Sequence, residues 1–182
     1  MIIIPNLISL GRLLAVPVAV WLILNDHMET AFWLFIAAGI SDAVDGFIAK
    51  HFNAETQIGR FLDPLADKAL LTSVYAILGY QGYLPLWLVI LVVFRDILII
   101  GGAILFHTVT RNLTMEPIKV SKVNTAAQIG LAAMVLGFAG FGVGSDVLVP
   151  LAEVAVGATT VLSGGAYVVI WSRRAFEMEA PE

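Results

Sequence analysis

Six long apolar stretches, separated by short polar segments, follow one another along the chain. They cover residues 7–24, 31–50, 59–79, 84–106, 120–143 and 149–171. Each holds about the 20 residues that an α-helix needs to cross the hydrocarbon core of a bilayer. No internal repeat or low-complexity linker interrupts the series. The pattern predicts an all-α integral membrane protein with six transmembrane helices, organised as a single domain over residues 1–182.

Composition supports this assignment and excludes several other classes of protein. Of the 182 residues, 59% are hydrophobic and 13% are charged, whereas ordinary soluble domains are about 25% charged. The chain has no cysteine, which excludes a disulfide scaffold and a thiolate metal site. A net charge of -4 with ten Lys and Arg residues argues against a nucleic-acid partner.

The basic residues are distributed unevenly between the two sides of the predicted bundle. If the six spans alternate in direction, nearly all of them fall at one face: Arg12, Lys50, Arg60, Lys68, Arg111, Lys119, Lys122, Arg173 and Arg174. The opposite connections hold no Lys or Arg, and Arg95 lies inside a span. Cytoplasmic segments are enriched in Lys and Arg. The N- and C-termini are therefore expected to be cytoplasmic.

Four aspartates lie where the second and third apolar stretches approach that basic face. Asp42 and Asp45 are three residues apart, and Asp63 and Asp67 are four apart, so each pair shares one face of its helix. A short connection lets all four carboxylates converge, and their mutual repulsion then requires cations. An all-oxygen site suits hard ions such as Mg²⁺, Mn²⁺ or Ca²⁺. Two such ions could hold a phosphoryl group between them.

Small residues accompany the acids. Gly46 and Ala49 follow Asp45, and Gly59 precedes Asp63 by four residues. They leave room for a ligand to approach the helix backbone, although small residues also serve helix packing in membranes. The whole stretch reads Asp-x2-Asp-Gly-x2-Ala-Lys-x8-Gly-x3-Asp-x3-Asp. It resembles the signature of the CDP-alcohol phosphotransferase family. One position departs from that signature, because Lys50 stands where the family usually has Arg.

The resemblance implies a function and a role for each matching residue. Members of the family are integral membrane enzymes that move a phosphatidyl or similar group from a CDP-linked donor to an alcohol. Asp42, Asp45 and Asp63 correspond to metal ligands, and Asp67 corresponds to a ligand that also acts as the catalytic base. The resemblance implies Mg²⁺ or Mn²⁺ as the cofactor, in two sites, and a homodimer. The residues that correspond to the CDP-binding wall are Gly46, Ala49, Lys50 and Gly59.

Two further segments indicate a branch of the family. The opening over residues 4–12, Ile-Pro-Asn-Leu-Ile-Ser-Leu-Gly-Arg, is similar to both phosphatidylglycerophosphate synthases and CMP-forming cardiolipin synthases. The pair Arg95-Asp96 and the segment Ser-Lys-Val-Asn-Thr over residues 121–125 resemble the cardiolipin synthases. The expected reaction transfers a phosphatidyl group from CDP-diacylglycerol to phosphatidylglycerol. The alternative acceptor is glycerol 3-phosphate.

Several basic residues are candidates for binding lipid phosphate, each with a simpler alternative. Arg95 and Asp96 could instead form a structural ion pair inside the bundle. Lys119 and Lys122, at the start of the fifth stretch, could instead be ordinary cytoplasmic anchors. The full candidate set for lipid phosphate is Arg60, Arg95, Lys119 and Lys122.

Two other interpretations of the chain remain open. Intramembrane carboxylates together with Arg95 would also suit a small ion transporter, but no inverted repeat supports it. The first apolar stretch could be a signal peptide, but it lacks a basic start. Because no Arg- and Ser-rich leader is visible, the expected location is the bacterial inner membrane, with the active site at its cytoplasmic side.

Overall fold

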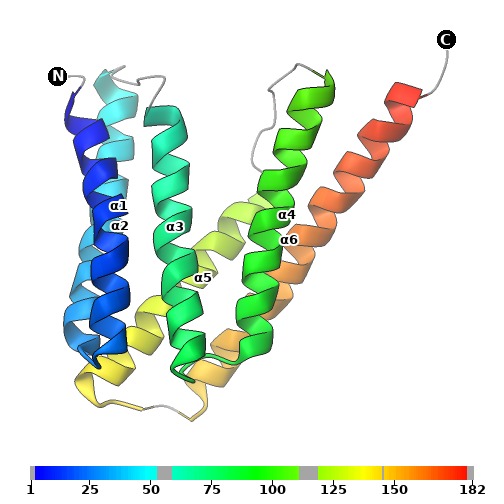
Figure 1. Cartoon of the computed structure of the whole chain (residues 1–182). Coiled ribbons are helices and arrows are strands. Elements are labelled where there is room, and N and C mark those ends of the chain that lie inside the picture. The colour runs from blue at the N-terminus through cyan, green and yellow to red at the C-terminus, as the bar shows by residue number, and fades with distance from the viewer. Residues whose placement is uncertain (1–2, 53–58, 111–118, 145, 180–182) are drawn as a thin grey trace. The chain divides into compact units, whose positions relative to one another are not determined.

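A computed structural model describes the backbone of residues 3–52, 59–110, 119–144 and 146–179, and the side chains of 10–42, 68–102, 119–144 and 146–172. Every regular element in these ranges is a helix, and there are six (Figure 1). In chain order they are α1 (Ile3–Leu24), α2 (Met28–Phe52), α3 (Gly59–Tyr80), α4 (Leu86–Thr110), α5 (Lys119–Phe141) and α6 (Leu148–Glu179). The all-helical expectation is confirmed, although α6 continues past the predicted end at residue 171.

Three of the helices end in the same kind of turn. Asp26, Gly82 and Gly142 follow α1, α3 and α5, with φ angles of 60°, 81° and 65°. After α1, the His27 N–H bonds to the Leu22 carbonyl at 2.9 Å, and the corresponding bonds follow α3 and α5. This is the Schellman arrangement, in which a left-handed residue lets the chain satisfy the last helical carbonyls. It explains why these connections are short.

The helices fall into two compact units. The first, Met1–Leu84 with Ala132–Asp146, contains α1, α2, α3 and the second half of α5. In it Gly140 of α5 lies so close to α2 that an added Cβ would be 2.6 Å from the Glu29 backbone nitrogen. The core of this unit is apolar and includes Ile23, Val74 and Tyr75, all without exposed surface.

The second unit, Pro85–Leu131 with Val147–Glu182, contains α4, the first half of α5 and α6. Its interior includes the apolar side chains of Leu88 and Val92 but also several polar ones. Those that are buried are Arg95, Asp96, Asn124, Gln128, Thr160 and Ser163. A polar interior in an apolar unit is costly unless its groups bond to one another.

The outer surfaces of both units are rich in large apolar side chains. Leu14 and Trp33 in the first unit and Phe94 and Leu162 in the second are 56% to 65% exposed. In water such surfaces mark interaction sites or an aggregation hazard, whereas lipid tails solvate them well. Among the described residues, two helical segments are both long and apolar enough to cross a bilayer, Lys119–Phe141 and Leu148–Ser172.

Candidate active site

Asp42 is the one member of the predicted carboxylate cluster whose side chain the structure describes. It lies on α2, and its Oδ1 accepts a hydrogen bond from Nη1 of Arg12 on α1 at 2.8 Å. The Arg12 side chain is 2% exposed, whereas that of Asp42 is 49% exposed. The carboxylate is thus held by a buried cation while remaining open to a ligand. Its fixed, acceptor-only oxygens suit a hard cation.

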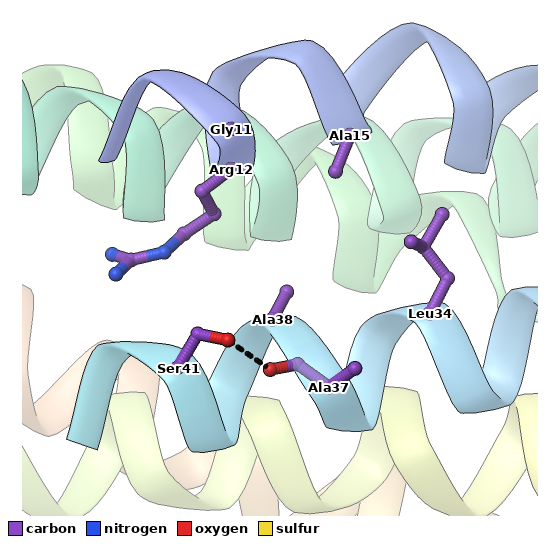
Figure 2. A pocket seen from close by; sticks show the side chains of 7 residues that line it. All are labelled: Gly11, Arg12, Ala15, Leu34, Ala37, Ala38 and Ser41. Carbon is purple, nitrogen blue, oxygen red and sulfur yellow. Dashed lines mark hydrogen bonds between the residues drawn. The ribbon is translucent and has the colours of Figure 1, made fainter. Parts of the chain in front are cut away.

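A groove lies beside this ion pair, between α1 and α2. It has a volume of about 300 Å³ and is lined by Gly11, Arg12, Ala15, Leu34, Ala37, Ala38 and Ser41. Figure 2 shows Arg12 and Ser41 toward one end and Ala15 and Leu34 toward the other. The Ser41 hydroxyl donates to the Ala37 carbonyl at 2.7 Å. Arg12 is the charged residue of the groove lining. We refer to it below as the α1–α2 groove.

The other motif residues lie on α2 and α3, but their side chains are outside the described set. Asp45, Gly46, Ala49 and Lys50 are in the helical backbone of α2, and Gly59, Arg60, Asp63 and Asp67 are in that of α3. The helical spacing assumed for each aspartate pair is therefore present. The convergence of the four carboxylates stays a prediction, as do the roles of the small and basic residues.

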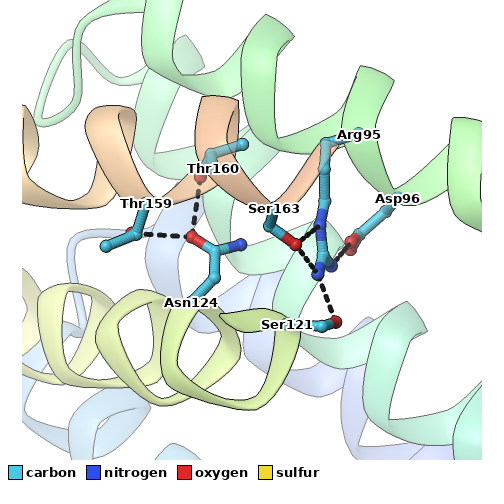
Figure 3. A network of polar contacts seen from close by, with 7 residues as sticks. All are labelled: Arg95, Asp96, Ser121, Asn124, Thr159, Thr160 and Ser163. Atoms are coloured by element: carbon cyan, nitrogen blue, oxygen red, sulfur yellow. Dashed lines mark hydrogen bonds and ion pairs between the residues drawn. The ribbon is translucent and has the colours of Figure 1, made fainter. Parts of the chain in front are cut away.

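In the second unit, Arg95 is the centre of a buried network (Figure 3). Its Nη1 donates to Oδ1 of Asp96 at 2.7 Å. Its Nε and Nη2 donate to the Ser163 hydroxyl of α6 at 3.2 and 2.7 Å, and Nη2 also donates to the Ser121 hydroxyl of α5. Arg95 and Asp96 are 3% and 5% exposed. The guanidinium therefore ties three helices of the unit together.

A second set of polar contacts lies along the same helices. Oδ1 of Asn124 on α5 accepts bonds from the hydroxyls of Thr159 and Thr160 on α6 at 2.8 and 2.9 Å (Figure 3). Asn124 and Thr160 are buried. Such bonds join helices where water is absent. Lys119 and Lys122, by contrast, are exposed on the first turn of α5, a position that fits both a phosphate contact and an interfacial anchor.

Sequence reasoning did not identify several residues of these two sites. Arg12 was recognised as a basic residue of the opening segment, without its link to Asp42. Ser121, Ser163 and Thr160 were not singled out. A usable signal was present, because hydroxyl residues three or four positions apart on an apolar helix, such as Thr160 and Ser163, mark one polar face.

Comparison with known proteins gives the family. Residues 2–171 match the CDP-alcohol phosphatidyltransferase family, and the chain belongs to it. The family consists of integral membrane enzymes that use a divalent metal. The chain is similar to the proteins named cardiolipin synthase (CMP-forming) of Rattus norvegicus and Homo sapiens. They are 32% and 31% identical to it over 180 residues, 90% of this chain.

Another relative carries a different name. The rice (Oryza sativa subsp. japonica) protein called CDP-diacylglycerol–glycerol-3-phosphate 3-phosphatidyltransferase 1, chloroplastic, is 36% identical over 149 residues, which is 72% of this chain and 45% of the rice protein. The chain spans about 60% of the length of the rat and human relatives that it matches. Relatives of both names thus share the family, and the comparison leaves the acceptor to be argued separately.

Proposed function

We propose that this chain is a CMP-forming cardiolipin synthase, which transfers a phosphatidyl group from CDP-diacylglycerol to phosphatidylglycerol. The observation that carries the proposal is the extent of the similarity. The rat and human proteins named as cardiolipin synthases align with 90% of the chain, whereas the two relatives named for glycerol 3-phosphate align with 72% and 74%. Three other relatives named as cardiolipin synthases align with 53% to 74% of it, so the argument rests on the rat and human proteins. The Arg95-Asp96 pair and the Ser-Lys-Val-Asn-Thr segment over residues 121–125 support the same branch.

The proposed setting is the bacterial inner membrane. Six spans with both termini in the cytoplasm accord with the one-sided Lys and Arg distribution and with the exposed apolar side chains on both units. The proposed assembly is a homodimer of chains that each form a single domain over residues 1–182. A membrane location suits the reaction, because both substrates and the product carry acyl chains that stay in the bilayer.

The proposed site residues are those of the family signature. Two divalent ions, Mg²⁺ or Mn²⁺, would be held by Asp42, Asp45, Asp63 and Asp67. The CDP group would contact Gly46, Ala49, Lys50 and Gly59, and lipid phosphate would contact Arg60, Lys119 and Lys122. Arg95, the fourth candidate for lipid phosphate, is buried and bonded to Asp96 and Ser163, which favours its structural role. The half-exposed carboxylate of Asp42, fixed by Arg12 at 2.8 Å, supports the first set. When bound, the ions neutralise phosphate oxygens and the charge that develops on the leaving group.

The proposed reaction is a single displacement. Asp67 accepts the proton of a primary hydroxyl of phosphatidylglycerol. The hydroxyl oxygen forms a bond to the phosphorus that bears diacylglycerol, the bond from that phosphorus to the CMP oxygen breaks, and CMP leaves with the electron pair. A carboxylate is a weak base toward an alcohol, so positioning and electrostatic stabilisation supply most of the rate.

The test uses the purified full chain in detergent with Mg²⁺ or Mn²⁺ and CDP-diacylglycerol. Phosphatidylglycerol and glycerol 3-phosphate are supplied separately, and lipid products and CMP are identified by mass spectrometry. Cardiolipin and CMP are expected with phosphatidylglycerol. If product forms with glycerol 3-phosphate and none forms with phosphatidylglycerol, the choice of acceptor is overturned. The family chemistry would remain intact.

The second candidate is phosphatidylglycerophosphate synthase. It is favoured by the 36% identity of the rice protein and by a Cereibacter sphaeroides protein named for the same activity, which is 35% identical over 143 residues. Its acceptor would be a soluble phosphate dianion, which demands basic groups at the site. In the described part of the second unit, the buried Arg95 already bonds to Asp96, an arrangement that offers less to a dianion.

A further inference from the structure

The α1–α2 groove has the polarity of a phospholipid. Arg12 and Ser41 lie toward one end, and Ala15 and Leu34 lie toward the other (Figure 2). From Leu34 to Ser41 the helix advances by about 10 Å. A groove that is polar at one end and lined by small apolar side chains along the rest of its length fits an apolar chain with a polar head.

The surroundings of the groove indicate which solvent meets it. Leu14 and Val18 on α1 and Ile40 on α2, which flank the lining residues in sequence, are 62%, 48% and 60% exposed. In a membrane protein such a surface faces lipid rather than water. Burying an acyl chain there gains van der Waals contact and a fixed position, since lipid tails are themselves apolar.

The charged end of the groove identifies the lipid. Arg12, which lines the groove, also donates to Asp42 at 2.8 Å, and Asp42 belongs to the acidic set proposed to hold the divalent ions that would neutralise the donor's phosphates. A lipid whose phosphates lie at Asp42 would have its glycerol backbone near Arg12. We propose that the α1–α2 groove holds one acyl chain of the CDP-diacylglycerol donor. This inference rests on the proposed function, because it takes the liponucleotide as the donor.

The test fills the groove and measures the dependence on donor chain length. Gly11 lines the groove, and an added Cβ there meets no atom within 4 Å. Gly11→Leu should place its side chain where the acyl chain would lie. Gly39→Leu is the matched control, because Gly39 is also exposed, helical and open to an added Cβ but does not line the groove. Ala37→Leu is a second filling variant.

Binding of dioleoyl and dioctanoyl CDP-diacylglycerol is measured by native mass spectrometry and by thermal shift in detergent, so that the result does not require turnover. The wild type and Gly39→Leu should favour the long-chain donor equally. Gly11→Leu and Ala37→Leu should reduce that preference severalfold, because a filled groove withholds its van der Waals contacts from the long chain. Purified variants are first compared by circular dichroism.

The outcomes separate this inference from the function on which it rests. An unchanged long-to-short ratio in both filling variants, with donor still bound, would overturn the groove assignment and leave the proposed function standing. If the filling variants instead change the chain-length dependence for phosphatidylglycerol or for the surrounding lipid, the groove holds another lipid. That result would overturn the assignment equally. Failure of the wild type to bind either liponucleotide would instead refute the proposed function.

Discussion

The two Arg–Asp pairs of this protein differ in what they leave open. In the Arg12–Asp42 pair the cation is buried and the carboxylate is half exposed, at 2% and 49% of the side chain. In the Arg95–Asp96 pair both partners are buried, at 3% and 6%. The first arrangement holds an acid ready for a ligand, whereas the second neutralises both charges and ties helices together. In this protein an Arg–Asp pair therefore indicates a ligand site only where one of its partners stays exposed.

The largest effect is expected from Asp42→Asn. If Asp42 is a metal ligand, its loss should reduce turnover by roughly a thousandfold or more, as for other essential catalytic groups. Asp146→Asn, in an exposed connection, is the control and should remain active. Turnover is followed as CMP release from CDP-diacylglycerol, with folding checked by thermal melting. A well-folded Asp96→Asn variant that loses as much activity as Asp42→Asn would break the comparison.

The next effect concerns stability. Arg95→Met withdraws the guanidinium from the buried Asp96 carboxylate and should destabilise the protein by about 3–5 kcal/mol. Replacing the pair together, as Arg95→Met with Asp96→Leu, should restore much of that loss because no buried charge remains. Unfolding in mixed detergent micelles, monitored by circular dichroism, measures both. A single variant as stable as the wild type would show that the pair is not structural.

A smaller effect is expected at Arg12. Arg12→Gln removes the group that orients Asp42, and groups that hold a metal ligand typically contribute about 10–100-fold to affinity. The Mn²⁺ concentration for half-maximal activity should rise by about tenfold, and Mn²⁺ binding followed by electron paramagnetic resonance should weaken in parallel. For Arg12→Lys, which keeps the charge, the Mn²⁺ concentration for half-maximal activity should lie between the values for the wild type and Arg12→Gln. Identical Mn²⁺ curves for all three proteins would contradict a positioning role.

The smallest effect is expected beside Arg95. An added Cβ at Gly164 would lie 3.7 Å from Cγ of Arg95, which is an ordinary contact, and alanine is favoured over glycine in a helix by about 1 kcal/mol. Gly164→Ala should therefore leave stability unchanged or raise it slightly, with Gly165→Ala as the control in open space. A marked loss of stability in Gly164→Ala alone would mean that the packing around Arg95 is tighter than this distance indicates.

Much of the fold was predictable because each helix carries its own signal. The apolar stretches coincide with the six helices, and Gly82 and Gly142 are residues on which helices commonly end. Asp26 is different, since aspartate adopts a left-handed conformation only occasionally. The continuation of α6 to Glu179 was also not predictable from apolar length, because charged residues past 171 can stay helical outside a bilayer core.

The site was predictable only as far as local spacing reaches. Asp42 could be singled out because its motif lies within two neighbouring helices. Its partner Arg12 is 30 positions away, and Ser163 is 68 positions from Arg95. Pairings of that kind depend on how helices pack, which periodicity does not specify. The same limit explains why the sequence left Arg95 open as a phosphate ligand or a partner of Asp96. The structure has the ion pair with Asp96, and the bonds to Ser121 and Ser163 could not be read from spacing.

The distribution of side chains inverts the usual rules of mutational tolerance. Outward-facing leucines, such as Leu14 and Leu162 at 62% and 65% exposure, are positions where a lysine would be harmless in a soluble protein. In the proposed six-span arrangement such a lysine would meet hydrocarbon, at a cost of several kcal/mol for a charge near the bilayer centre. Conversely, exchanges among Leu, Ile, Val and Phe at these positions should be nearly silent, so that natural variants are expected to drift there while keeping their apolar character.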